Sequence, residues 1–109
     1  MAHYMKLDNI INRIKEINTN IKFVGSFDEN NRRTGYWEEY WDNGKLCSKG
    51  KYLNGLRYGY WGEYWYNGNV SLKGYYKNGK ADGYWEFYHA NGKLWYRGNY
   101  KNREFYEIQ

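Results

Sequence analysis

Apolar residues near the start of the chain recur at the spacing of one helix face. They are Leu7, Ile10, Ile11, Ile14 and Ile17, and polar or charged residues fill the other faces. Spacings of three and four residues are typical of an amphipathic α-helix. We therefore predict a helix over residues 5–18, ended by the turn-forming residues 18–20, and treat residues 1–22 as an N-terminal cap.

From residue 35 the pattern changes to a repeat with a period of 24 residues. Three copies, at 35–58, 59–82 and 83–106, align without a gap, and a half copy at 23–34 precedes them. The shared positions are Trp37/Trp61/Trp85, Tyr40/Tyr64/Tyr88, Asn43-Gly44/Asn67-Gly68/Asn91-Gly92, Gly50/Gly74/Gly98 and Tyr52/Tyr76/Tyr100. Such regular spacing indicates a repeat array, whose altered end units cap it.

Each copy contains an Asn-Gly pair between aromatic and aliphatic residues, which is the strongest short-range signal of a β-hairpin. A two-residue type I′ turn at Asn43-Gly44 would set Trp37 opposite Gly50 and Trp41 opposite Leu46. The tryptophan ring is then expected to lie over the facing glycine and fill the space above it. Residues 23–109 are therefore predicted to form a mainly β domain. It is one elongated, twisted antiparallel sheet of about eight strands, with the helix packed over its first edge.

Alternation along the strands assigns the first hairpin's residues to two faces. The predicted core face carries Trp37, Glu39, Trp41, Leu46, Ser48, Gly50 and Tyr52. The opposite face carries Tyr36, Glu38, Tyr40, Cys47, Lys49 and Lys51. Both faces hold aromatic rings, so the second face either packs on itself under strong twist or serves as a contact surface.

Composition supports a folded chain despite its low aliphatic content. Aromatic residues make up 23% of the sequence, and the net charge of +5 comes with a mean hydropathy of −1.13. Tyrosine and tryptophan bury large areas although they count as mildly polar, so the hydropathy understates what the chain can remove from water. The sequence contains no membrane-spanning run and no secretion signal, and we expect a soluble, cytoplasmic protein.

The unit G-Y-W-x-x-Y-x-x-N-G, followed by G-x-Y-x-N-G, resembles the MORN repeat over residues 24–106. The likeness is to the bacterial variant found in proteins labelled as toxin-antitoxin system antitoxins. The resemblance implies a β-hairpin solenoid without catalytic activity that offers a binding or scaffolding surface. Eukaryotic relatives are linked with membranes, phospholipids and protein partners, and the bacterial variant with neutralising toxins. This chain departs from the pattern at Gly62, which replaces the glutamate found at Glu38 and Glu86, and in residues 1–22, which match no part of the repeat.

Few residues suit catalysis or metal binding. His3 lies near the terminus, His89 takes a position held by Trp41 and Trp65, and Cys47 is the one cysteine. No nucleophile has a base at a sequence-defined spacing, and one histidine cannot build a metal site. We predict no enzymatic activity, no cofactor and no metal.

The candidate partner-binding residues are aromatic and basic. They are Tyr36, Tyr60, Tyr66, Tyr75, Tyr84, Trp95, Lys49, Lys51, Lys73, Lys77, Arg97 and Lys101. The basic residues form either a solvated face with cross-strand pairs such as Glu38–Lys49 and Glu86–Arg97, or an anion-binding stripe. Two further carboxylates, Glu39 and Glu63, either receive a cationic group or accept hydrogen bonds from tyrosine hydroxyls at a solvated rim.

These features favour a binding protein. The first hypothesis is an antitoxin, immunity protein or other inhibitor, including one used in counter-defence, that neutralises one specific protein: a toxin, effector or nuclease. Nucleic-acid binding through the lysine and arginine stripe, with tyrosine stacking, is the second. Self-assembly or scaffolding at a membrane surface is the third, although a membrane partner is the least expected.

Overall fold

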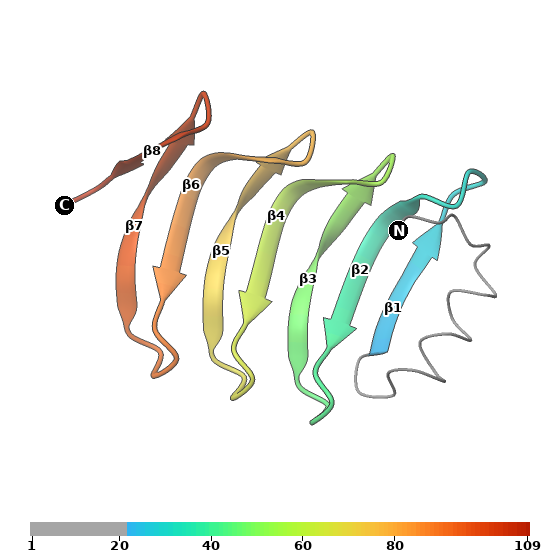
Figure 1. Cartoon of the computed structure of the whole chain (residues 1–109), viewed down its shortest axis with the longest axis horizontal. Helices are drawn as coiled ribbons and strands as arrows, with labels where there is room; N and C mark the ends of the chain where they lie inside the picture. Colours follow the sequence, from blue (N-terminus) through green and yellow to red (C-terminus); the bar gives the residue numbers. More distant parts are fainter. Residues whose placement is uncertain (1–21) are drawn as a thin grey trace, which may run out of the picture.

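The computed structural model describes residues 22–109, and all eight of its strands belong to one open antiparallel sheet. The predicted helix over residues 5–18 and His3 lie outside the described residues. The strands are β1 (Lys22–Phe27), β2 (Arg33–Tyr40), β3 (Leu46–Leu53), β4 (Leu56–Tyr64), β5 (Val70–Lys77), β6 (Lys80–Tyr88), β7 (Leu94–Lys101) and β8 (Glu104–Glu107). Their order in the sheet is their order in the chain, as Figure 1 shows. The predicted mainly β, eight-stranded meander is confirmed for this part of the chain.

The connection between β2 and β3 is longer than predicted. The N–H of Trp41 donates to the carbonyl of Lys45 at 2.8 Å, and the N–H of Gly44 donates to the carbonyl of Trp41 at 2.9 Å. Only Gly44 of the Asn43-Gly44 pair has a positive φ, of 84°. The loop is therefore a three-residue turn closed by Trp41 and Lys45, and the predicted type I′ turn at this position is wrong.

Type I′ turns instead connect each β-hairpin to the strand that follows it. They lie at the other ends of the strands, opposite the loop at Asn43-Gly44 (Figure 1). Both residues of Asn54-Gly55 have positive φ values, 53° and 80°, as that turn requires. The equivalent turns are Asn78-Gly79 and Asn102-Arg103. We call the edge with these turns the tight-turn rim, and the edge with loops 41–45, 65–69 and 89–93 the wide-loop rim.

The predicted pairing between β2 and β3 nevertheless holds over most of its length. Trp37 pairs with Gly50 and Glu39 with Ser48, but Tyr40, not Trp41, pairs with Leu46. The register shift between Glu39 and Tyr40 leaves Cys47 as an extra residue, a β-bulge that offsets the extra loop residue. Two departures from regularity therefore cancel, and the predicted Trp41–Leu46 pair is the part that fails.

The tryptophan ring of each Gly-Tyr-Trp motif lies over a glycine of the preceding strand. The pairs are Trp37 on Gly25, Trp61 on Gly50 and Trp85 on Gly74. A Cβ atom at these glycines would come within 2.0 to 2.2 Å of the ring carbons, so no other residue fits. The prediction that each ring covers the glycine it pairs with in the following strand is wrong, because the chain bulges just before each tryptophan.

That bulge has a sequence cause in the Gly-Tyr-Trp motif. Gly59 adopts a φ of 73°, which side-chain-bearing residues rarely take, and pairing between β3 and β4 shifts where Gly50 faces it. The shift swings the Trp61 ring back across β3. Its indole N–H then donates to the carbonyl of Lys51 at 3.0 Å, and the other repeats form the same bond.

Aromatic rings continue this packing along one side of the sheet. Tyr52 lies edge-on between Trp37 and Trp61, with ring centroids 5.9 and 5.1 Å away, and Tyr76 lies in the same way between Trp61 and Trp85. Trp37 and Trp61 are each only 1% exposed. We call this side the tryptophan face. It is the core of the protein, although no second layer covers it in the described residues.

A glycine-to-alanine substitution should separate the role of ring packing from that of strand propensity. Gly74→Ala places a methyl group about 2.0 Å from the Trp85 ring, so the free energy of unfolding should fall by about 3 kcal/mol, the upper end of overpacking costs. Chemical denaturation measures the change. Gly62→Ala is the control and should be close to neutral, since its methyl group meets the Tyr64 side chain alone, with the hydroxyl at 3.1 Å and two ring carbons at 3.5 Å. Equal losses in both variants would contradict the packing role.

Candidate functional site

The side of the sheet opposite the tryptophans carries the tyrosines of each Gly-Tyr-Trp motif. We call it the tyrosine face, formed by Tyr36, Glu38, Tyr40, Lys49, Lys51, Tyr60, Tyr64, Lys73, Tyr75, Lys77, Tyr84, Glu86, Tyr88, Arg97 and Lys101. Ten of the twelve predicted partner-binding residues lie on this face. The structure thus brings the predicted tyrosines and basic residues together.

In the first and third repeats, two tyrosines donate to one glutamate. The hydroxyls of Tyr36 and Tyr40 donate to the two oxygens of Glu38 at 2.8 and 2.6 Å. Tyr84 and Tyr88 hold Glu86 in the same way, at 2.8 and 2.6 Å. Residues two apart on a strand share a face, so this Tyr–Glu–Tyr arrangement follows from the local sequence.

These hydrogen bonds change the acidity of both partners. The bonds from Tyr88 and Tyr84 lower the pKa of the Glu86 carboxyl, and Lys73 and Arg97 act in the same direction. The bond to Glu86, together with burial, raises the pKa of Tyr88 to about 12. Burial and then the bond to Glu38 raise the pKa of Tyr36 to about 12 as well. Both glutamates are therefore held ionised and both tyrosines protonated at neutral pH.

The expected cross-strand ion pairs do not form. Lys49 pairs with Glu38 and Arg97 with Glu86 in the backbone register, but the salt bridges of residues 22–109 lie elsewhere. The tyrosine hydroxyls take the carboxylate oxygens instead. Lys49, Lys73 and Arg97 therefore make no salt bridge within residues 22–109, and the Lys73 ammonium lies 5.9 Å from the centroid of the Tyr88 ring.

Three tyrosines of this face are well exposed. Tyr36, Tyr60 and Tyr75 have exposed fractions of 48%, 47% and 48%, whereas Tyr84 is half-buried. Tyr60 and Tyr75 pair across β4 and β5 with ring centroids 5.5 Å apart. These tyrosines thus contact one another and still present ring surface to solvent, and a contact surface on this face stays a prediction.

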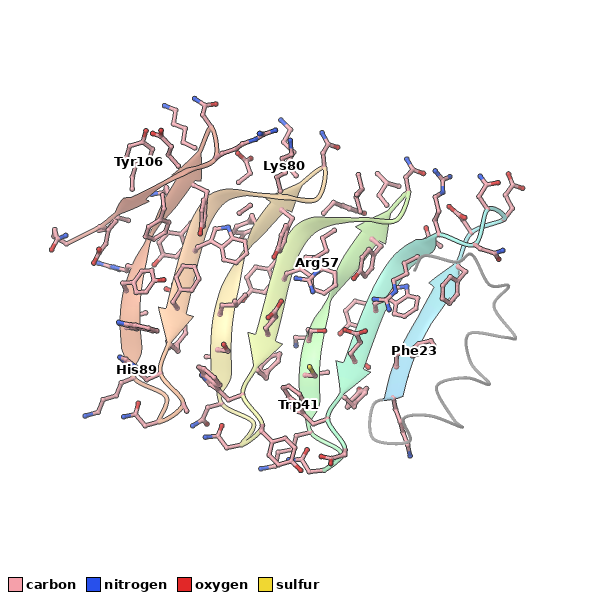
Figure 2. All side chains as sticks on the ribbon, in the orientation of Figure 1. Phe23, Trp41, Arg57, Lys80, His89 and Tyr106 are labelled. Atoms are coloured by element: carbon pink, nitrogen blue, oxygen red, sulfur yellow. The ribbon has the colours of Figure 1, made fainter. Side chains whose placement is uncertain are left out.

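The tryptophan face holds ion pairs that the sequence analysis missed. Arg57 donates to Glu63 at 2.9 Å while its guanidinium carbon lies 4.0 Å from the Trp61 ring centroid (Figure 2). Arg33 lies over Trp37 and contacts Glu39 at 3.4 Å. Burial alone would lower the pKa of Arg57, but its hydrogen bond to Glu63 and its interactions with Tyr52 and Tyr76 together outweigh burial and raise it. The cationic group beside each of these carboxylates is therefore an arginine of the chain itself.

A signal for these pairs exists in the repeat alignment. At the period of 24 residues, Ala81 stands where Arg33 and Arg57 stand earlier in the chain, and Phe87 stands where Glu39 and Glu63 do. The arginine and the glutamate disappear together. Phe87 stacks on Trp85 at a centroid distance of 5.9 Å, which replaces the stacked guanidinium with a ring.

The remaining two predicted site residues lie away from the tyrosine face. Tyr66 sits at the wide-loop rim, donates to Asp42 and packs edge-on against Trp41. Trp95, which is 61% exposed, stacks on His89 at 4.7 Å at the same rim. Both therefore belong to the contacts of the loops, which also link successive repeats through bonds such as Asn43 to the carbonyl of Tyr66.

Cys47 also departs from its predicted face. Burial, and then the charges of Glu39 and Glu63, raise the pKa of its thiol, and those carboxylates belong to the tryptophan face. The bulge at Cys47 breaks the alternation that assigned it to the opposite side. A raised pKa keeps the thiol protonated and poorly nucleophilic.

Two other kinds of feature are absent from the part of the chain that is described. No group of three histidine, cysteine or acidic residues there is arranged to hold a metal ion. Within the same residues, no helix has the length and apolar character needed to cross a membrane.

Comparison with known families identifies the repeated unit. A model described as MORN repeat variant matches residues 33–54 and 81–102. Both matched segments are MORN repeats. Among curated proteins, none matches it.

The two matched MORN repeats begin 48 residues apart, twice the internal period. Each contains one Tyr–Glu–Tyr arrangement, around Glu38 in the first and Glu86 in the second. The copy between them, at residues 57–78, keeps both tyrosines and lacks the glutamate, because Gly62 stands there. The middle copy therefore differs from its neighbours in chemistry on the tyrosine face while sharing their fold.

Removing one carboxylate should shift the titration of its tyrosine. In Glu86→Gln the pKa of Tyr88 is expected to fall from about 12 toward the ordinary 10.0, since the charge that favours its protonated form is gone. Titration of the Tyr88 ring by NMR measures it. Glu104→Gln, next to Tyr106, is the control and should leave Tyr88 unchanged. An unshifted Tyr88 in Glu86→Gln would refute the assignment.

The same groups set how stability depends on pH. Because the folded pKa of Tyr88 and Tyr36 is raised, their contribution is present below pH 10 and lost as pH rises toward 12. The lowered pKa of Glu38 and Glu86 gives a contribution that is present above pH 4.5 and lost as pH falls below it. Denaturation across both windows should therefore show stability falling at each end.

The coupled loss of arginine and glutamate gives a double-mutant test. Arg57→Ala leaves Glu63 beside Trp61 without its cation and should cost about 1–2 kcal/mol of unfolding free energy. Adding Glu63→Phe recreates the residues of the third repeat, so the double variant should recover most of that loss. Denaturant unfolding of the four proteins of the cycle gives the coupling energy. Additive losses would show that the two positions act independently.

Proposed function

We propose that this chain is a non-enzymatic binding module that docks one specific protein through its tyrosine face. It neutralises that protein as an antitoxin, immunity protein or other inhibitor does. The observation that carries the proposal is the exposure of Tyr36, Tyr60 and Tyr75 beside basic side chains on one side of a sheet. Tyrosine is enriched in binding surfaces because it offers large contact area with little side-chain entropy to lose.

The difference in packing between the two faces of the sheet supports this proposal. The tryptophan face is occupied by its own rings and by Arg33 and Arg57, so it has little left to offer a partner. The tyrosine face carries no such layer. MORN repeats place the same set of groups at a fixed spacing across neighbouring strands, and such a patterned surface suits a partner of complementary shape.

The charge pattern favours a protein over nucleic acid. Reading across the sheet, the paired residues are Glu38, Lys49, Gly62, Lys73, Glu86 and Arg97. A nucleic-acid backbone gains affinity from each neutralised phosphate, and the two ionised glutamates in this row would repel it. A protein surface with alternating charges can match both signs. Nucleic-acid binding through Lys73, Arg97 and the exposed tyrosines remains the competing outcome of the test.

Capture from the native host followed by affinity measurement tests the proposal. We expect the tagged chain to retain one protein, and Tyr36→Ala with Tyr75→Ala to weaken its binding at least about 10-fold, as loss of interface tyrosines does. The control is Tyr106→Ala, which removes an equally exposed ring from β8 at the sheet's edge. The captured protein's own activity should fall when the chain is added.

Three results would count against this function. Capture of no protein under mild conditions is one, and equal binding by the control and the double variant is another. The third is binding of a single-stranded oligonucleotide that falls steeply with salt and on charge reversal at Lys73 and Arg97, which would favour the nucleic-acid alternative.

A further inference from the structure

The centre of the tyrosine face lacks a carboxylate that its neighbours on both sides have. Glu38, Gly62 and Glu86 occupy the same repeat position on β2, β4 and β6. Gly62 has a lysine on each side in the sheet, because it pairs with Lys49 of β3 and with Lys73 of β5. The middle of the row therefore places two lysines next to a residue with no side chain.

The tyrosines that would bind this missing carboxylate are still present. Tyr60 and Tyr64 are the equivalents of Tyr36 and Tyr40, which donate to Glu38. Within residues 22–109 the structure records no hydrogen bond from the hydroxyl of Tyr60 or Tyr64. Gly62 is buried under the Tyr64 side chain, because a Cβ added to that glycine would meet the Tyr64 hydroxyl at 3.1 Å and two of its ring carbons at 3.5 Å.

The geometry of the flanking repeats shows which ligand such tyrosines accept. Each oxygen of Glu38 takes one hydroxyl, and the short distance of 2.6 Å from Tyr40 is that of a hydrogen bond to a charged acceptor. Glu86 repeats this pattern with Tyr84 and Tyr88. Two hydroxyls two residues apart on one strand thus match the two oxygens of a carboxylate.

Electrostatics at the centre favour the same ligand. Lys49 lies between Glu38 and Gly62, and Lys73 lies between Gly62 and Glu86, so each lysine has a carboxylate on one side only. A carboxylate over Gly62 would complete an alternating row of charges across six strands, from Glu38 on β2 to Arg97 on β7. It would also approach from solvent over the exposed ring of Tyr60.

We propose that a glutamate or aspartate side chain of the partner protein binds over Gly62, accepting hydrogen bonds from Tyr60 and Tyr64 between Lys49 and Lys73. The partner then supplies the carboxylate that Glu38 and Glu86 supply in the first and third repeats. This inference rests on the proposed function, since it names the contact at the centre of the docking surface. It also explains how a repeat surface becomes selective, because one position of three is left for the partner to fill.

A capped pentapeptide, acetyl-Ser-Gly-Glu-Gly-Ser-amide, is the probe, and its glutamine counterpart is the uncharged control. Tyrosine ring signals followed by NMR report binding. The wild-type chain should bind the glutamate peptide at least 5-fold more tightly than the glutamine peptide, with the largest shifts at Tyr60 and Tyr64. Tyr60→Phe with Tyr64→Phe, which removes only the hydroxyls, should abolish this preference.

Gly62→Glu provides the sharpest variant, because its own carboxylate would occupy the site. Glutamate is already accommodated at this repeat position in Glu38 and Glu86, so the variant should fold, and it should bind the glutamate peptide at least 10-fold more weakly than wild type. Asn99→Glu is the matched control, since it adds the same carboxylate at an exposed position of β7, opposite Tyr84 and away from Gly62, and should keep the preference.

Several outcomes would overturn the proposal. They are equal binding of the two peptides, undiminished peptide binding by Gly62→Glu, or a single-stranded oligonucleotide that displaces the glutamate peptide and shifts the same tyrosines more strongly. The captured partner separates this inference from the proposed function. If Tyr36→Ala with Tyr75→Ala loses the partner but Gly62→Glu keeps it, the inference fails and the function stands. If the peptide preference holds and no partner is captured, the function fails and the carboxylate site stands.

Discussion

The fold depends on one close approach, that of a tryptophan ring to a glycine backbone in the strand before it. A sheet with one uncovered side cannot bury its apolar groups between two layers, and here the rings lie flat on the sheet itself. The Trp61 ring excludes water from Gly50, and its indole N–H also satisfies a carbonyl of that strand. Because the same contact recurs in every repeat, each unit is held to the previous one by a ring that only glycine admits.

Much of this architecture could be predicted from the sequence, because the period and the Asn-Gly signals are local. The strand number, the Trp37–Gly50 backbone pairing and the exposed Tyr36 all follow from alternation and spacing. Alternation fails where the backbone bulges, and that is why Cys47 and the Trp37 ring lie away from their predicted places. A glycine in the left-handed region changes the direction of the side chains after it, and residue periodicity carries no information about that change.

The candidate site, like the fold, could be predicted from the sequence only in part. Tyrosines two residues from a glutamate are visible in the sequence, but their bonds to Glu38 displace the expected lysine pair, and this competition depends on side-chain reach. Arg57 was missed because it stacks on the Trp61 ring, and alternation does not predict that this ring lies across β3. Comparing the three copies with one another would have revealed it, since Ala81 and Phe87 change together. Differences between the repeats of one chain can thus reveal positions that change together.

The backward reach of the tryptophans also gives the array two different ends. Gly98 on β7 has no tryptophan after it, and Phe105 and the backbone of β8 lie over it instead. A unit inserted between two existing ones would meet a glycine on one side and a tryptophan on the other, as every internal unit does. Arrays of this kind can therefore lengthen or shorten from within by whole units, while the terminal strand that closes them stays unchanged.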